Sequence, residues 1–131
     1  MIVRRTALDD VVSHARETAP AECCGVLLGL EGIVVEARRT RNLATDVNRF
    51  LIDPKDHIDA RRAARPRRLD VVGFYHSHPR SAAIPSPTDL AEASYPDHLY
   101  LIVGLAGDEP DARLYRLEAD RFVELTFNFE L

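Results

Sequence analysis

Hydrophobic and polar positions follow two different periods along the chain, and together they predict an α/β fold. Residues 8–15 place apolar side chains at i, i+3, i+4 and i+7, which gives a helix one apolar stripe that packs on a sheet. Short apolar runs bounded by turn residues predict strands. These runs are residues 2–3, 25–30, 33–37, 50–52, 71–77, 99–105 and 113–117. We therefore expect a curved, mixed β-sheet with helices packed against it, in a single domain over residues 1–131.

Several element ends and surface positions can also be predicted. Thr6 can cap the first helix, and Asp53, which a proline follows, predicts the start of a second helix. His14 lies off the apolar stripe of the first helix, so we expect it in solvent, and His57 is expected at the surface of the second. Residues 123–131 alternate between apolar and polar side chains. This period of two predicts one half-buried terminal strand.

Composition fits a globular protein and limits its partners. Of 131 residues, 46% are hydrophobic, and the formal net charge of −4 gives no general reason to expect nucleic-acid binding. No stretch approaches the roughly 18 apolar residues of a membrane span. We therefore expect no membrane association and, by default, a cytoplasmic location.

The two cysteines, Cys23 and Cys24, are neighbours in the sequence. Adjacent cysteines rarely form a disulfide because the ring is strained, so the chain is expected to be free of disulfides and to occupy a reducing compartment. A small buried side chain at the entry to a strand is the simpler interpretation of each cysteine. A thiol that is oxidised near the site, or that binds the metal in an inactive state, remains an alternative.

Five arginines lie close together between Arg61 and Arg68, with one proline among them. Cations at the C-terminus of a helix are stabilised by the helix dipole, typically by about 0.3 to 1 kcal/mol each at low salt. A solvated helix end therefore explains the cluster. The functional alternative is a surface that meets an acidic partner, with a protein favoured over a nucleic acid.

Residues 71–89, VVGFYHSHPRSAAIPSPTD, carry the candidate chemistry. Alternate residues of a strand point to the same face, so His76 and His78 point the same way. The two imidazoles can therefore converge on one ion. Pro79 ends the strand because it has no N–H to donate, and an irregular loop follows.

The loop returns to a helix start that supplies a third possible ligand. Ser86 is expected at the N-cap, followed by a proline, and Asp89 falls in the first turn. Each feature alone is consistent with an ordinary cap or an ordinary core histidine. Together they supply three ligands and no fourth, which is what a catalytic zinc site with an open position requires.

The order H-S-H-P, six residues, S, two residues, D resembles the signature of the JAMM (MPN-plus) zinc metalloproteases. The resemblance covers roughly residues 6–105 and implies a deaminase-like α/β fold with a mixed sheet between helices. It also implies one zinc ion held by His76, His78 and Asp89. In this family pattern Glu22 looks like the catalytic base and acid, although by residue type alone it passes as an exposed loop carboxylate. Ser86 would donate a hydrogen bond to the oxyanion.

The resemblance further implies a substrate class. Members cut the peptide or isopeptide bond after the C-terminal Gly-Gly of ubiquitin-like proteins, and this short chain is similar to the small prokaryotic members, some of which act on sulfur-carrier proteins. A slender diglycine tail would fit a narrow groove beside an exposed strand. The alternatives are a non-catalytic MPN-type scaffold and a nucleic-acid-associated JAMM-like protein. Exposed edge strands would also allow a homodimer.

Overall fold

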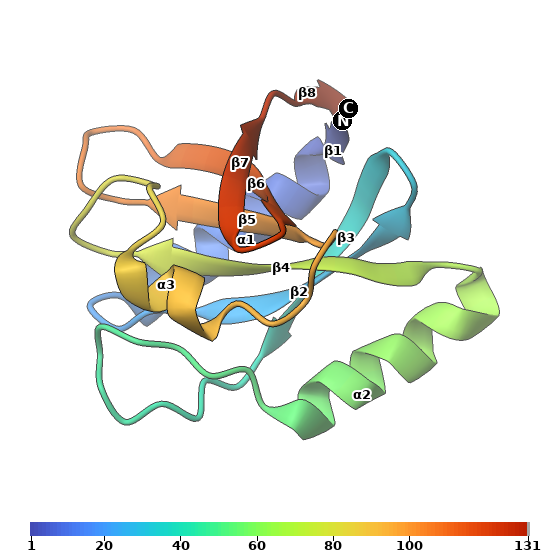
Figure 1. Ribbon diagram of the computed structural model, residues 1–131, viewed down its shortest axis with the longest axis horizontal. Coiled ribbons are helices and arrows are strands. Elements are labelled where there is room, and N and C mark those ends of the chain that lie inside the picture. Colours follow the sequence, from blue (N-terminus) through green and yellow to red (C-terminus); the bar gives the residue numbers. More distant parts are fainter. Residues whose placement is uncertain (131) are drawn as a thin grey trace.

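In the computed structural model, which describes residues 1–130, one eight-stranded sheet has helices on both faces (Figure 1). The elements are β1 (Ile2–Arg4), α1 (Arg5–Thr18), β2 (Cys24–Leu30), β3 (Ile33–Thr40), α2 (Pro54–Ala64), the 3-10 turn η1 (Arg65–Arg67), β4 (Asp70–His78), α3 (Pro87–Glu92), β5 (Leu99–Gly104), β6 (Asp111–Glu118), β7 (Arg121–Leu125) and β8 (Asn128–Glu130). Their order in the sheet is β7-β6-β5-β4-β2-β3-β1-β8. Parallel pairs join β4 to β5 and β1 to both β3 and β8, and the other pairs are antiparallel. The predicted mixed α/β sheet is confirmed.

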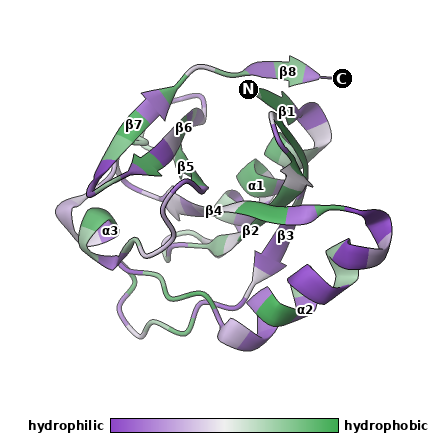
Figure 2. Cartoon of the chain, turned by 45° about the vertical axis from the view of Figure 1, so that its right-hand side comes forward, coloured by the Kyte–Doolittle hydropathy of each residue, from purple (hydrophilic) through white to green (hydrophobic). Residues whose placement is uncertain are grey.

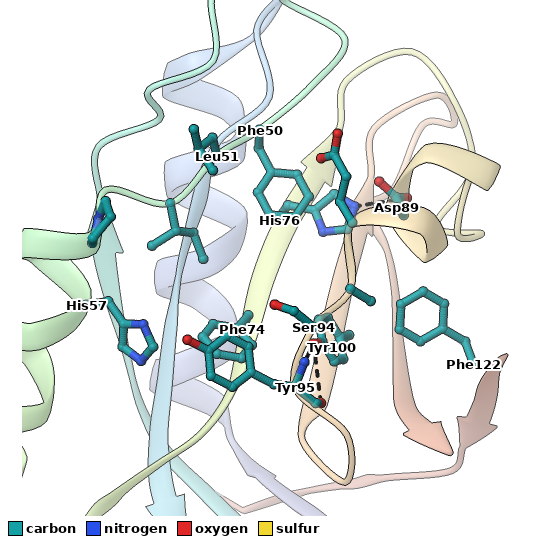
Figure 3. Close-up of a pocket in the computed structure, with 14 residues that line it drawn as sticks. Phe50, Leu51, His57, Phe74, His76, Asp89, Ser94, Tyr95, Tyr100 and Phe122 are labelled. Atoms are coloured by element: carbon teal, nitrogen blue, oxygen red, sulfur yellow. Dashed lines mark hydrogen bonds and ion pairs between the residues drawn. The ribbon is translucent and has the colours of Figure 1, made fainter. Parts of the chain in front are cut away.

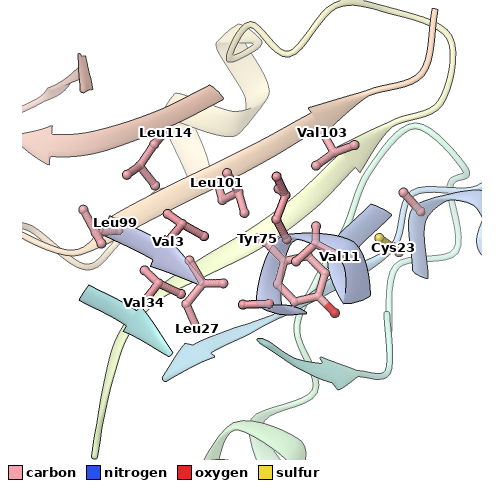
Figure 4. Close-up of a cluster of buried hydrophobic side chains, with 13 residues drawn as sticks. Val3, Val11, Cys23, Leu27, Val34, Tyr75, Leu99, Leu101, Val103 and Leu114 are labelled. Atoms are coloured by element: carbon pink, nitrogen blue, oxygen red, sulfur yellow. The ribbon is translucent and has the colours of Figure 1, made fainter. Parts of the chain in front are cut away.

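The hydrophobic core is divided by the sheet into two layers, and β5 contributes to both. Leu99, Leu101 and Val103 pack with α1 on one face, in the cluster drawn in Figure 4. Tyr100 and Ile102 pack with α2 on the other face. This two-sided burial explains why β5 reads as a nearly continuous apolar run in the sequence.

The central strand β4 carries the histidines to the α2 face. Tyr75 packs in the α1 layer and Phe74 in the α2 layer, as the alternation of a strand requires. His76 and Phe74 line the same cavity on the α2 side. Ser77 points the other way, and its hydroxyl accepts a hydrogen bond from the backbone N–H of Cys23 at 2.9 Å.

Two predictions about the first helix are wrong. The helix begins at Arg5 rather than after Thr6, and its N-cap Arg4 makes no side-chain cap, because β1 runs directly into it. His14 is buried, with 8% of its surface exposed, and its Nδ1 lies 2.7 Å from the hydroxyl of Tyr75. The buried face of the helix is therefore wider than its apolar stripe, because it also includes His14, which pairs with Tyr75 of the sheet.

The segment before α2 forms less regular structure than predicted. Of residues 50–52, only Ile52 forms a β-bridge, to Asn42. The predicted cap is confirmed, since the carboxylate of Asp53 accepts a hydrogen bond from the backbone N–H of Lys55 at 2.9 Å.

The predicted terminal strand is in fact two strands. β7 pairs with β6 as a hairpin, whereas β8 pairs with β1 at the opposite edge of the sheet. A period of two shows which side chains share a face but not which neighbour a strand takes, and for this reason the break was not predicted. Leu131 lies outside the described residues. A homodimer through either edge strand remains a prediction.

Within residues 1–130, no helix has the length and apolar character needed to cross a membrane.

Candidate metal centre and active site

Three side chains converge at the C-terminal end of β4. The Nε2 atoms of His76 and His78 are 3.2 Å apart, and Oδ2 of Asp89 lies 3.2 Å from the first and 3.0 Å from the second. Their side chains are 3%, 7% and 8% exposed, respectively. The structure thus brings together the three residues that the sequence suggested as metal ligands.

A capping box at the start of α3 aims the third of these side chains. The Ser86 hydroxyl accepts a hydrogen bond from the backbone N–H of Asp89 at 3.0 Å. In return, the backbone N–H of Ser86 donates to Oδ2 of Asp89 at 2.9 Å. These two bonds fix the carboxylate relative to the helix, so the same oxygen that completes the cap also faces the two imidazoles.

The spacing of the three atoms fits a zinc ion. Tetrahedral coordination with bonds of about 2.0–2.1 Å places ligand atoms about 3.3 Å apart, close to the separations of 3.0 and 3.2 Å here. His78 Nδ1 lies 2.9 Å from the carbonyl oxygen of Ala82. A proton on Nδ1 leaves the lone pair of Nε2 free for a metal. Three protein ligands would leave a fourth position open.

Burial and charge keep His76 and Asp89 in the forms that bind metal, whereas contact with the Asp89 carboxylate raises the pKa of His78 although burial alone would lower it. Burial lowers the pKa of His76, which favours the neutral imidazole. Burial alone would raise the pKa of Asp89, but hydrogen bonds with His76 and His78 hold it well below its usual range. The carboxylate is therefore ionised at any physiological pH.

Glu22 lies in the loop between α1 and β2, and this loop is held on both sides. Its backbone N–H donates to the carbonyl of Val47 at 3.2 Å, and the Asn42 amide donates to its carbonyl at 3.1 Å. The residue is 7% exposed, and its Oε1 has no hydrogen-bond partner among the described residues. Burial raises the pKa of Glu22 to about 7. An exposed loop carboxylate, the interpretation by residue type alone, is therefore wrong.

An apolar cavity of about 250 Å³ adjoins the ligands (Figure 3). Its lining consists mostly of aromatic and aliphatic side chains: Phe50, Leu51, Ile52, Pro54, His57, Phe74, His76, Asp89, Glu92, Ala93, Ser94, Tyr95, Tyr100 and Phe122. The ring of Phe50 stacks on that of His76, with centroids 4.3 Å apart. His57 lies edge-on to Phe74 and Tyr95 rather than free on the surface. Sequence reasoning missed the cavity because its walls come from five separate segments.

The surroundings of the cysteines disfavour a nucleophilic role and favour a structural one. Cys23 and Cys24 are both buried and free, as predicted. Burial raises the pKa of each thiol to about 11, and a thiol in that state holds its proton at neutral pH. The Cys24 sulfur lies 3.4 Å from the Thr40 hydroxyl, which is consistent with a structural role.

Three candidate metal ligands and a buried carboxyl whose charge interacts with two of them, set in a mixed sheet between helices, are typical of single-metal hydrolase domains. Comparison with known proteins then gives the family. The model for prokaryotic homologs of the JAB domain matches residues 4–118. The chain belongs to this family, and the predicted resemblance to the small prokaryotic JAMM proteins is confirmed.

Individual relatives are similar over nearly the whole chain. A desampylase from Haloferax volcanii is 39% identical over 133 residues, covering 95% of this chain and 92% of the relative. A CysO-cysteine peptidase from Mycobacterium bovis is 30% identical over 126 residues, covering 95% and 84%. The solution structure of a protein from Desulfitobacterium hafniense superposes with a TM-score of 0.91 at 29% identity, covering 99% of this chain and 93% of that one.

Proposed function

We propose that this protein is a zinc-dependent peptidase or isopeptidase that hydrolyses the amide bond after the C-terminal Gly-Gly of a ubiquitin-like or sulfur-carrier protein. The observation that carries the proposal is the convergence of three candidate ligand atoms near Glu22. The charge of Glu22 interacts with His78 and Asp89, and its buried Oε1 has no hydrogen-bond partner among the described residues. Names of relatives support the reaction class, since one is a desampylase and another a CysO-cysteine peptidase. The whole chain, residues 1–131, would act as one catalytic domain.

His76, His78 and Asp89 would hold the zinc ion. A bound zinc ion supplies Lewis acidity, which polarises the scissile carbonyl and lowers the pKa of a water molecule toward about 7. The stacking of Phe50 on His76 and the hydrogen bond between His78 and Ala82 keep the two rings in place.

Glu22 would move the proton. Its free Oε1 accepts the proton of the attacking water, and the same carboxyl then donates it to the departing nitrogen. A general acid–base group works best when its pKa lies near the working pH. Burial gives Glu22 such a pKa, about 7.

Ser86 would stabilise the oxyanion of the tetrahedral intermediate. Its hydroxyl oxygen accepts the capping bond from Asp89, so its own proton is available to a second acceptor. Loss of one such donor typically lowers kcat by roughly a hundred to a thousand-fold. The cap and the catalytic donor would thus be the same hydroxyl.

The substrate's C-terminal tail would occupy the apolar cavity. Two of the three ligand residues, His76 and Asp89, line that cavity, so a chain lying in it reaches the reaction centre. A diglycine has no side chains beyond hydrogen and can pass close to the ligands, where the loop of Phe50 approaches them.

The test is an intact-mass assay of zinc-loaded wild type and Glu22→Gln on a ubiquitin-like sulfur carrier extended past its Gly-Gly. We expect a product ending in Gly-Gly from wild type alone, with equal zinc content in both proteins. Hydrolysis by Glu22→Gln at the wild-type rate would refute the role of Glu22. Zinc binding without cleavage would instead support the non-catalytic scaffold.

A further inference from the structure

Three arginines lie at the end of α2 and in the turn that follows it, and we call them the arginine stripe. Arg61 lies in the last turn of α2, Arg65 in the 3-10 turn, and Arg68 caps that turn in the left-handed region with φ 56°. All three are exposed. They line a hollow of about 230 Å³ together with Leu69, Asp70 and Val71.

The fold gains little from the arginine stripe. Within residues 1–130, none of its three guanidinium groups forms an ion pair with a carboxylate, whereas the neighbouring Arg67 lies 2.9 Å from Glu36. Like charges four residues apart destabilise a helix by roughly 0.2–0.5 kcal/mol. Arg61 lies in the last turn of α2, where the helix dipole offsets this repulsion. The dipole favours cations at a helix end, but it does not require that three guanidinium groups without carboxylate partners among the described residues line one hollow.

The arginine stripe begins where the apolar cavity ends. His57 lines that cavity, and its Nε2 lies 3.2 Å from the guanidinium of Arg61. At 1.5 Å of rise per residue, Arg65 lies about 12 Å beyond His57 along the helix axis. In Figure 1, α2 leads away from α3 toward the start of β4, and Figure 2 colours most of it as hydrophilic. Arg61 therefore contacts a residue of the cavity wall, and the arginine stripe leads from that contact away from α3.

We propose that the arginine stripe binds an acidic face on the folded body of the ubiquitin-like carrier whose tail occupies the cavity. This inference rests on the proposed function, because it requires that the carrier's tail reach the site. A folded body cannot enter a cavity of about 250 Å³, so it must rest on the surface outside it, and Arg61 lies on that surface next to His57 of the cavity wall. Guanidinium groups pair with surface carboxylates through two parallel hydrogen bonds.

The surroundings of the stripe favour a protein over a nucleic acid. Asp70 lines the same hollow, and Asp59 lies on α2 beside Lys55, with which it forms an ion pair of 2.8 Å. The chain also has a net charge of −4. A continuous run of phosphates would meet these carboxylates, whereas a protein surface presents separate carboxylates that can match the three arginines one by one.

The test measures binding, so it does not depend on cleavage. In the Glu22→Gln background, the triple variant Arg61→Gln, Arg65→Gln, Arg68→Gln is compared with a control triple, Arg16→Gln, Arg116→Gln, Arg121→Gln. The control arginines also lack carboxylate partners within the described residues. The probes are an acidic ubiquitin-like sulfur carrier ending in Gly-Gly, the same carrier with its body carboxylates changed to amides, and a synthetic peptide of its tail.

We expect the stripe variant to bind the folded acidic carrier roughly tenfold more weakly at low ionic strength, with a smaller salt dependence. Binding of the tail peptide and of the neutralised carrier should not change, and the control triple should match its parent. The inference would be overturned if the stripe variant lost affinity equally for the carrier and the tail peptide, or if it lost no affinity for the carrier. So would a stripe-dependent affinity for fluorescent duplex DNA that exceeds the affinity for the carrier. If wild type cleaves nothing while the stripe still binds the acidic carrier, the proposed function fails and the docking surface stands.

Discussion

Replacing Glu22 by Gln should stabilise the metal-free protein at alkaline pH. Burial raises the pKa of this carboxyl from 4.5 to about 7, and the negative charge of Asp89 adds to the effect, while His78 opposes it. The ionised form is costly because Oε1 is buried and has no hydrogen-bond donor among the described residues to replace water. Glutamine has nearly the same shape and carries no charge, so the substitution removes that cost.

The sign and size of the effect follow from proton linkage. Between about pH 4.5 and pH 7, folded protein keeps a proton on Glu22 that unfolded chains have released. The contribution of this group to the free energy of unfolding is therefore fully present below pH 4.5 and is lost as the pH rises through 7. At about 1.4 kcal/mol per pH unit, the loss amounts to about 3 kcal/mol.

The assay is urea unfolding of wild type and Glu22→Gln with a chelator present, because a bound cation would attract the carboxylate and hide its cost. We expect the variant to be more stable by less than 1 kcal/mol near about pH 5 and by about 3 kcal/mol near about pH 8.5. Glu17→Gln is a control for which we expect the stability change to have the opposite sign, because a hydrogen bond from Arg39 lowers the pKa of Glu17. A stability difference that does not grow with pH would refute the buried, unpaired state of Glu22.

Three further substitutions test the site and its support. Asp89→Asn should lower zinc affinity at least about a hundredfold, more than the loss of an outer-shell partner does. Competition with a chromophoric chelator measures the affinity, and an unchanged value would exclude Asp89 as a ligand. Tyr75→Phe should reduce the free energy of unfolding by about 1–3 kcal/mol in urea, because it leaves His14 unpaired, and a neutral result would show that water replaces the hydroxyl. Phe50→Ala should weaken zinc binding several-fold, because it removes the stacking of the Phe50 ring on His76, which contributes about 0.5–1.5 kcal/mol of stabilisation. An unchanged zinc affinity would show that this stacking does not hold His76 in place.

The part of the site that the sequence predicted is local. His76 and His78 share a face because a strand repeats every two residues, and the proline after them ends the strand. Ser86 and Asp89 form the capping box that their spacing indicates. All four positions fall within one short segment, so local backbone geometry is enough to bring three of them to one point and to place the fourth beside it.

Other features depended on the tertiary structure. Glu22 resembles any loop carboxylate in sequence, and the backbone that positions it is held by Asn42 and Val47, which belong to a segment beyond β3. The same holds for His14, which pairs with Tyr75 across the interface between helix and sheet. A residue's exposure, and with it its pKa, depends on which distant segments cover it.

The sequence by itself determined most strand periods, the caps at Asp53 and Ser86, the three candidate metal ligands and the family resemblance, because each rests on spacing along the backbone. Only the tertiary structure decided that β7 and β8 separate to opposite edges of the sheet, that Glu22 is buried, and that an apolar cavity adjoins His76 and Asp89. Periodicity specifies the face on which a side chain lies. It does not specify which distant segment packs against that face, and that packing sets the charge, the burial and the shape of the site.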